Sequence, residues 1–191
     1  MEKTTVRSAA REISYTAMFV AIIAVCAWIA IPLPSNISIT LQTMGVCLAA
    51  GFLGWKRGLI AVAVYILLGL CGVPVFQGFT AGAAKLGSVT GGYIVGFLFT
   101  AAAVGLAADY IKVKSGWLRA AVLVAAMVVG VALCYLFGTI WFIYVYNAGA
   151  DTTVTFAAAL MTCVVPYILP DLVQIVCAAA LVTKLKKYMK L

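Results

Sequence analysis

The 191-residue chain is 66% hydrophobic and only 9% charged, with a mean hydropathy of +1.18, whereas soluble domains carry about a quarter charged residues. This composition excludes a soluble enzyme and predicts an integral membrane protein. The net charge of +8 does not require a nucleic-acid partner, because basic loops on the cytoplasmic side of a membrane account for it, with a smaller contribution from anionic lipid.

Six apolar runs predict an all-α membrane protein, a six-transmembrane-helix bundle that forms one domain over residues 1–191. The second and third runs are short, but packing inside a bundle relaxes the length that a crossing requires. Under this arrangement twelve of the 13 basic residues lie on one side and only Lys85 on the other. The positive-inside rule then places both termini in the cytoplasm. The runs are Ser14 to Ile31, Leu41 to Leu53, Leu59 to Leu70, Gly91 to Ala108, Leu118 to Ile143 and Phe156 to Val182.

The N-terminal residues 1–13 are predicted to be a basic lead-in at the cytoplasmic surface, in which Arg7 and Arg11 are one helical turn apart. No cleavage pattern of a signal peptide follows. The first span carries Ala17-Met-Phe-Val-Ala21, a pair of small residues four apart that lets another helix approach closely. It is either ordinary packing within the bundle or a docking face for a partner subunit.

The segment from Ile31 to Thr43 contains two prolines and then alternates apolar and polar residues over Ile37 to Gln42. This pattern predicts an outside loop or a short extended lid. Gln42 and Thr43 begin the second span, where their side chains either point into a pocket or cap the helix. Farther on, Gly54-Trp-Lys-Arg-Gly58 predicts a tight cytoplasmic turn.

Residues 72–92 are predicted to be an extracellular, glycine-rich binding loop within the longest non-helical segment of the chain. The loop holds six of the 17 glycines, Gly78 among them, beside Gln77 and Phe79, and Tyr93 follows it. Glycine lets backbone approach a ligand, and aromatic rings enclose a flat apolar one; the alternative is a plain flexible loop. Lys85 either meets a carboxylate on the ligand or is a solvated lysine at the lipid headgroups.

Aromatic residues end the fifth span, including Tyr135 and Trp141, and predict an interfacial belt, although either of these two side chains is also a candidate for a pocket wall. In the last span, Asp171 is the only charge between about residues 155 and 183. A charge there costs about 2.5 to 3.5 kcal/mol on insertion scales, so it is retained mainly where it faces a bundle interior or a ligand. Tyr167, Asp171 and Gln174 share one helix face.

Several chemistries are excluded. The chain has no Gly-x-x-x-x-Gly-Lys-Ser/Thr motif, the sequence that binds nucleotide phosphates. It also has no histidine and no paired acids, which leaves no catalytic residue for general acid and base chemistry. The six cysteines are spaced singly in or beside apolar runs, so we expect packing roles and neither a metal site nor a disulfide framework. The chain is therefore predicted not to be an enzyme and to need no cofactor. What remains is recognition of a small neutral or monoanionic molecule from the outside face.

Five motifs resemble those of the BioY family, the biotin-specific substrate-binding S components of energy-coupling factor (ECF) vitamin transporters. They are Ala17-x-x-x-Ala21, Ile39-Thr-Leu-Gln-Thr43, Gly72-Val-Pro-Val-Phe76, Thr90-Gly-Gly-Tyr93 and Pro170-Asp171. The resemblance implies a bacterial plasma-membrane bundle that binds biotin with high affinity and docks on a transmembrane T subunit with two cytoplasmic ATPases, which topple it to release the vitamin. The alternatives are an S component for another vitamin, such as riboflavin or thiamine, or a self-sufficient small transporter.

The resemblance also implies roles for individual residues. Asp171 would accept the ureido N–H groups of biotin, Lys85 would meet its carboxylate, and Phe76, Phe79 and Tyr93 would wall its apolar ring, while Ala17 and Ala21 would contact the T subunit. The other expected substrate-binding residues are Gln174, Tyr167, Gln77, Gln42 and Gly78.

Two positions depart from the family pattern. Gln174 stands where the family usually has a lysine, and is expected not to pair with Asp171. Ser88-Val-Thr-Gly-Gly-Tyr93 stands where Gly-Pro-Thr-Gly-Gly-Tyr is usual, which suggests a less rigid turn.

Overall fold

The structure is a computed structural model that describes residues 2–31, 38–110, 115–149, 153–186 and 188, with only the backbone described for residues 2–9. Residues 32–37 of the expected outer loop lie outside the described part. So do four of the expected cytoplasmic cations, Lys112, Lys114, Lys187 and Lys190, and the side chains of Lys3 and Arg7.

The fold is predominantly helical. Its long helices are α1 (Glu2–Trp28), α2 (Gln42–Leu70), α4 (Gly91–Tyr110), α5 (Gly116–Gly149) and α7 (Val165–Leu185). Each is long and apolar enough to cross a membrane, which makes five candidate spans among the described residues, the first from Ala10 to Trp28. Shorter elements are β1 (Ala30–Ile31), β2 (Ile39–Thr40), the 3-10 turn η1 (Gln77–Phe79), α3 (Ala83–Leu86) and α6 (Phe156–Cys163).

Helix α2 contains the second and third apolar runs, and it turns sharply at Gly54. The backbone of Gly54 has φ 80° and ψ −176°, a left-handed φ that glycine adopts most easily. The two halves of α2 pack against each other beside the turn, because a Cβ on Gly58 would lie only 2.7 Å from Cα of Ala50. Asp109, at the end of α4, accepts a hydrogen bond from the backbone N–H of Trp55 at 2.9 Å. The predicted turn at Gly54 is therefore present.

The last apolar run does not form one continuous helix. Helix α6 ends at Cys163, the next residue, Val164, has a φ of −121° and a ψ of −53° that are not helical, and α7 starts directly after it. Pro166 explains the break, since it has no N–H to continue the hydrogen bonds of α6 and proline is favoured in the first turn of a new helix. Pro170 is accommodated inside α7.

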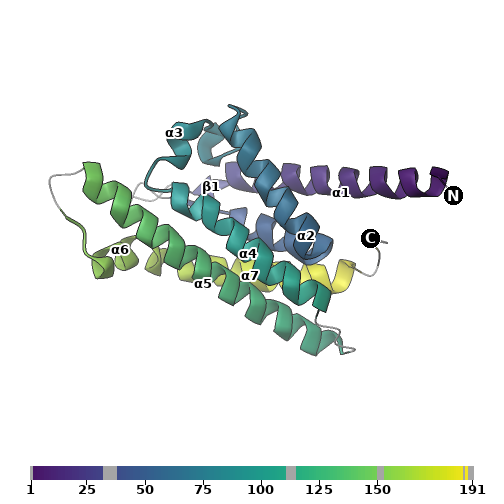
Figure 1. Cartoon of the computed structure of the whole chain (residues 1–191). Helices are drawn as coiled ribbons and strands as arrows, with labels where there is room; N and C mark the ends of the chain where they lie inside the picture. Colours follow the sequence, from purple (N-terminus) through teal and green to yellow (C-terminus); the bar gives the residue numbers. More distant parts are fainter. Residues whose placement is uncertain (1, 32–37, 111–114, 150–152, 187, 189–191) are drawn as a thin grey trace.

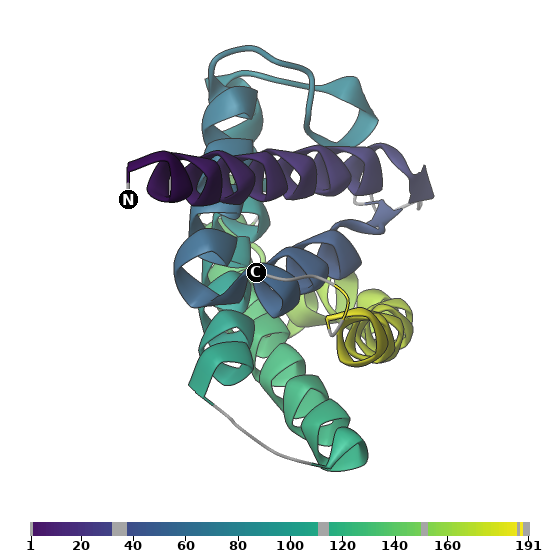
Figure 2. The same ribbon diagram turned by 90° about the vertical axis from the view of Figure 1, so that its right-hand side faces the viewer.

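Helix α2 lies at the centre of the bundle, where it packs against α1, α4 and α7, while α5 packs against α4 and α7. Figures 1 and 2 show this arrangement, and in Figure 1 the N-terminal half of α1 projects beyond the other helices. Close helix contacts depend on small residues: a Cβ on Gly138 of α5 would lie 2.3 Å from the ring of Tyr93 on α4. The interior is filled by large apolar side chains, among them Tyr65, Phe76, Ile23 and Met127.

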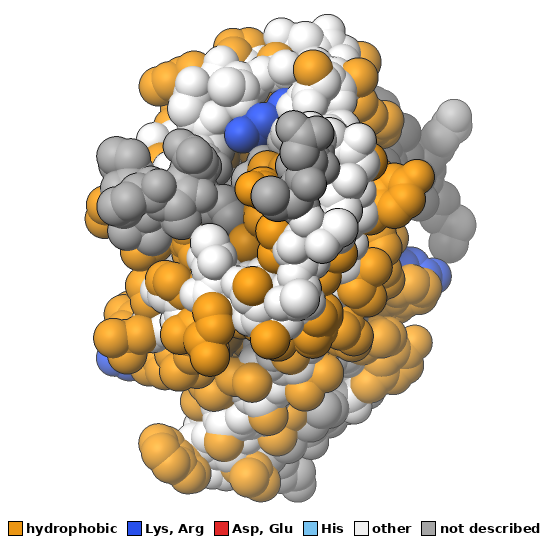
Figure 3. Space-filling model, turned by 90° about the vertical axis from the view of Figure 1, so that its left-hand side faces the viewer, with side chains coloured by type: hydrophobic (Ala, Val, Ile, Leu, Met, Phe, Trp, Pro, Cys, Tyr) orange, Lys and Arg blue, Asp and Glu red, His pale blue; other side chains and the backbone are white. Residues whose placement is uncertain are grey.

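Short loop elements cover one end of the bundle, the end at the left of Figure 1 and facing the viewer in Figure 3. The strands β1 and β2 pair antiparallel, with Ala30 opposite Thr40, so the alternating segment forms a small extended element as expected. The segment between α2 and α4 was predicted to be non-helical, but it contains η1 and α3. Trp28 fastens it to α1, because its indole N–H donates to the Pro74 carbonyl at 2.9 Å and its ring stacks on Phe79.

Candidate ligand-binding site

A cavity of about 770 Å³, counted with its open mouth, lies among α2, α4, α5, α7 and the loop elements. About half of the lining residues are polar or charged. Its lining consists of Ser38, Ile39, Thr40, Gln42, Thr43, Gln77, Lys85, Thr90, Tyr93, Ile94, Phe97, Val131, Cys134, Tyr135, Cys163, Tyr167 and Asp171.

Asp171 brings a carboxylate into this cavity from the interior of α7. Its Oδ2 accepts a hydrogen bond from the phenol O–H of Tyr135 on α5. Its Oδ1 accepts one from the side-chain amide of Gln174 at 3.0 Å, and the Thr43 hydroxyl also interacts with the carboxylate. The carboxylate is thus held from three helices, which fixes its direction before a ligand arrives.

Gln174 is buried next to Asp171 and does not line the cavity. Its amide nitrogen also donates to the Thr40 carbonyl at 3.0 Å, and its amide oxygen accepts from the Met44 backbone N–H at 3.1 Å. The expectation that Gln174 does not pair with Asp171 is therefore wrong, because a neutral amide N–H donates to a carboxylate without an ion pair. The same amide joins α7 to β2 and to the start of α2.

Gln42 lines the cavity, as expected for an amide at the start of α2. Its side-chain nitrogen donates to the hydroxyl of Tyr65 at 2.7 Å. Its oxygen lies 3.5 Å from the Thr40 hydroxyl. Gln77 also lines the cavity, from η1, so two of the predicted amides reach the same space.

Aromatic and thiol groups form another part of the wall. The hydroxyl of Tyr93 lies 3.1 Å from that of Thr139, and the thiol of Cys134 donates to the Tyr93 carbonyl at 3.4 Å. Tyr167 is buried and lines the cavity from α7, one turn before Asp171. The predicted shared face of Tyr167 and Asp171 is therefore directed at the cavity.

Lys85 reaches the cavity from α3, outside the membrane-spanning helices, and is the only cation among the described lining residues. Its side chain is half-buried, and this burial lowers the pKa of the ammonium from its ordinary value of 10.5. Desolvation disfavours the charged form of a lysine. An anion bound beside Lys85 would offset that cost.

The turn between α3 and α4, for which the sequence suggests less rigidity, contains three hydrogen bonds that involve side chains. The hydroxyl of Ser88 donates to the Lys85 carbonyl at 2.6 Å and lies 3.1 Å from the Thr90 hydroxyl. The indole N–H of Trp141 donates to the Ser88 carbonyl at 3.1 Å. The bond from Trp141 links this turn to α5.

Several residues expected at the site lie elsewhere. Phe79 is exposed and stacks on Trp28, and Gly78, with φ 69°, has no atom within 4 Å of a Cβ built on it. Phe76 is fully buried against Tyr65 with a ring separation of 5.6 Å. None of these three residues, nor Gln174, lines the cavity.

From the sequence alone, Tyr135 is a candidate either for an interfacial belt or for a pocket wall, and nothing marks Thr90, Ile94, Phe97 or Cys134 as site residues. A signal for Tyr135 was available, since a phenol on a neighbouring span is a natural donor to a buried carboxylate. The others follow only from how α4 and α5 pack.

Comparison with known proteins agrees with this architecture. The model of the family described as "BioY family" matches residues 1–191. The chain is 38% identical over 178 residues to the biotin transporter BioY of Thermotoga maritima, covering 93% of this chain and 96% of that protein. It is 32% identical over 177 residues to the probable biotin transporter BioY of Pyrococcus horikoshii, covering 93% and 97%.

A solved structure has the same fold. It is a crystal structure of the S-component for biotin from an ECF-type ABC transporter, and it matches with a TM-score of 0.81 and 26% sequence identity over 95% of this chain and 93% of that one.

The fold and the cavity define a multi-pass membrane protein with an internal small-molecule site, which is the architecture of a transport component. The chain belongs to the BioY family, over its whole length. Members of this family are S components of transporters and not enzymes, so the expectation of a non-enzyme is confirmed.

Proposed function

We propose that this chain binds biotin in the cavity and presents it for ATP-driven import as the S component of an ECF transporter. The observation that carries the proposal is Asp171, a carboxylate held by neutral donors in a cavity where Lys85 is the only other charged residue among the described lining residues. The ureido ring of biotin has two N–H donors, and Asp171 has an acceptor site for one of them. Charge-assisted hydrogen bonds contribute about 1.5 to 3 kcal/mol each, a substantial part of the roughly 12 kcal/mol of a nanomolar site.

The rest of the ligand has matching partners in the lining. Tyr93, Phe97 and Tyr167 offer aromatic surface to the thiophane ring, and Gln42 and Gln77 add amide groups. We assign the valerate carboxylate to Lys85, whose half-buried ammonium gains from an anionic partner. Phe79, Gly78 and Gln174 are not given a direct contact with biotin, since they lie outside the lining.

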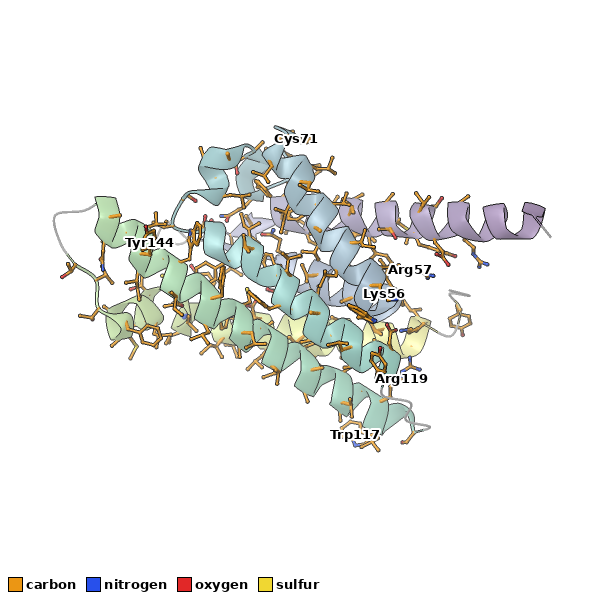
Figure 4. The ribbon with its side chains drawn as sticks, in the orientation of Figure 1. Lys56, Arg57, Cys71, Trp117, Arg119 and Tyr144 are labelled. Carbon is orange, nitrogen blue, oxygen red and sulfur yellow. The ribbon has the colours of Figure 1, made fainter. Side chains whose placement is uncertain are left out.

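We further propose six membrane crossings with both termini in the cytoplasm. Helix α2 supplies two of the crossings on either side of Gly54, and α6 with α7 supplies the last. The distribution of cations supports this orientation, because Lys56, Arg57 and Arg119 lie toward the end of the molecule opposite Tyr144 (Figure 4). Basic residues favour the cytoplasmic face. The cavity loops, including α3, then face outward.

We assign energy supply to separate subunits, a T subunit and two cytoplasmic ATPases, since the chain has no nucleotide-binding motif. Ala17 and Ala21 are exposed on α1, so their small side chains leave a surface on which a helix of the T subunit can pack closely. Exposed Ile13, Met18 and Val25 extend this apolar face along α1.

The decisive experiment identifies the ligand that co-purifies with the chain. Mass spectrometry of the denatured eluate should detect biotin, and calorimetric titration of the emptied protein should give tight binding of one biotin per chain. Riboflavin or thiamine in place of biotin would overturn the substrate assignment. Biotin uptake into liposomes that contain this protein alone, without an ATPase, would instead favour a self-sufficient transporter.

A further inference from the structure

All the contacts that hold the Asp171 carboxylate come from neutral groups. They are the phenol of Tyr135, the amide of Gln174 and the hydroxyl of Thr43. Among the residues that the structure describes, the ion pair found joins Arg57 to Glu12, and none involves Asp171. The carboxylate is oriented by hydrogen bonds, but no cation among the described side chains contacts it to offset its charge.

Both N–H donors of the Gln174 amide are used by these contacts. Its oxygen accepts from the Met44 backbone N–H, which fixes which end of the amide is the nitrogen. Its two N–H groups are directed to the Thr40 carbonyl and to Asp171, each at 3.0 Å, and an amide has no further hydrogen to donate. Gln174 is therefore a positioning residue that aims Asp171 without adding positive charge or a donor to the cavity.

Asp171 keeps some acceptor capacity for a ligand. A carboxylate offers about four lone-pair sites, and Tyr135, Gln174 and Thr43 take three of them. About one site is then left for an N–H group of the ligand ring, and a hydrogen bond there is stronger when the donor is charged.

From this charge balance we infer that Gln174 sets the specificity for the ring of the ligand: the site accepts a cyclic guanidinium about as readily as a neutral cyclic urea. A ring that brings its own positive charge neutralises Asp171, whereas a neutral ring leaves the buried charge without a counter-ion. A cation at position 174 would remove this tolerance by repelling a charged ring. The inference rests on the proposed biotin site and deepens it.

The test compares biotin with 2-iminobiotin, in which a cyclic guanidine replaces the cyclic urea and which is protonated at neutral pH as an arginine side chain is. Both ligands carry the same valerate chain, so the contribution of Lys85 cancels in the ratio of their Kd values. Calorimetric titration of the purified, emptied full chain would be run for wild type, Gln174→Lys and Gln174→Glu, with size-exclusion profiles as the check on folding.

For wild type we expect the Kd of 2-iminobiotin to be less than about threefold that of biotin. Gln174→Lys should raise the ratio of the two Kd values at least tenfold, and Gln174→Glu, which keeps the shape and adds an anion, should lower it. A wild-type ratio above threefold, or a ratio unchanged by a folded variant, would overturn the inference. If Gln174→Lys does not fold, the ratios of the two Kd values for wild type and for Gln174→Glu test the inference. Failure of wild type to bind either ligand would instead count against the proposed function.

Discussion

The phenol of Tyr135 on α5 donates a hydrogen bond to Oδ2 of Asp171 on α7, across the interior of the bundle. The two residues are 36 positions apart, and both line the cavity. This contact fixes one oxygen of the carboxylate and leaves the other to Gln174. It therefore determines the direction in which the site accepts hydrogen bonds.

Replacing Tyr135 by phenylalanine should weaken biotin binding by roughly tenfold, since a hydrogen bond to a charged group contributes about 1.5 to 3 kcal/mol. The ring and its packing are retained, so the protein should still elute as a single species. Calorimetric titration measures the change. The matched control is Tyr144→Phe, which removes a phenol from an exposed position on the same helix outside the cavity and should leave the affinity unchanged.

Asp171→Asn should weaken biotin binding by at least tenfold while leaving the protein folded. An asparagine keeps the size of the side chain but replaces one acceptor oxygen by a donor, which opposes both the phenol of Tyr135 and an N–H of the ureido ring. The affinity is measured by titration of the purified variant. Unchanged affinity in a folded Asp171→Asn protein would show that Asp171 does not contribute to biotin binding.

Lys85→Ala should cost more affinity for biotin than for biotin amide, because only biotin carries the carboxylate that we assign to Lys85. Equal losses for the two ligands would show that Lys85 does not contact the carboxylate.

The same assignment predicts a pH dependence. Binding of the carboxylate requires a protonated ammonium, so this part of the affinity is fully present below the pKa of Lys85 and is lost as pH rises through it. Burial lowers that pKa from 10.5, so the loss should begin at a lower pH than for an exposed lysine. Titrations of wild type across alkaline pH should show it for biotin and not for biotin amide.

The sequence predicts those site residues whose type is unusual at their position in the chain. Asp171 is the only charge in its apolar run, and Lys85 is the only cation expected outside, so membrane energetics alone marks both as candidates. The Gly54 turn is equally local, since two glycines flank the basic pair Lys56 and Arg57 between two apolar runs.

Contacts between distant segments could not be predicted in the same way. Gln174 bonds to Thr40 and Met44, which are 134 and 130 residues away, and no periodicity in the sequence records that pairing. Phe76 resembled a ligand contact because it lies in a glycine-rich loop, yet it fills the core beside Gly69, where a Cβ would lie 2.0 Å from its ring. Glycine here makes room for packing and not for a ligand.

Leucine at both Ala17 and Ala21 should reduce co-purification of the chain with a T subunit and ATPases while leaving biotin binding unchanged. Both alanines are exposed on α1 and lie outside the cavity lining, and larger side chains prevent close approach of a second helix. A pull-down of co-expressed subunits and a biotin titration measure the two properties. The matched control is leucine at Ala132, an exposed alanine on α5, and equal loss of co-purification in that variant would argue against a specific role for α1.

Gly54→Ala should lower the thermal stability of the protein, for two reasons that act at the same residue. Its φ of 80° is strained for any residue with a Cβ, at a cost of about 1–3 kcal/mol, and a Cβ there would lie 2.3 Å from Oδ1 of Asp109. The loss is measured as a fall in the midpoint of thermal unfolding in detergent. Gly116→Ala is the matched control, since nothing lies within 4 Å of a Cβ at that glycine, and its midpoint should stay close to wild type. The double variant Gly54→Ala with Asp109→Ala separates the causes: it removes the clash but retains the strain and also loses the hydrogen bond to Trp55, so its midpoint should remain below that of Asp109→Ala alone. A midpoint for Gly54→Ala equal to that of Gly116→Ala would show that the turn of α2 does not require glycine.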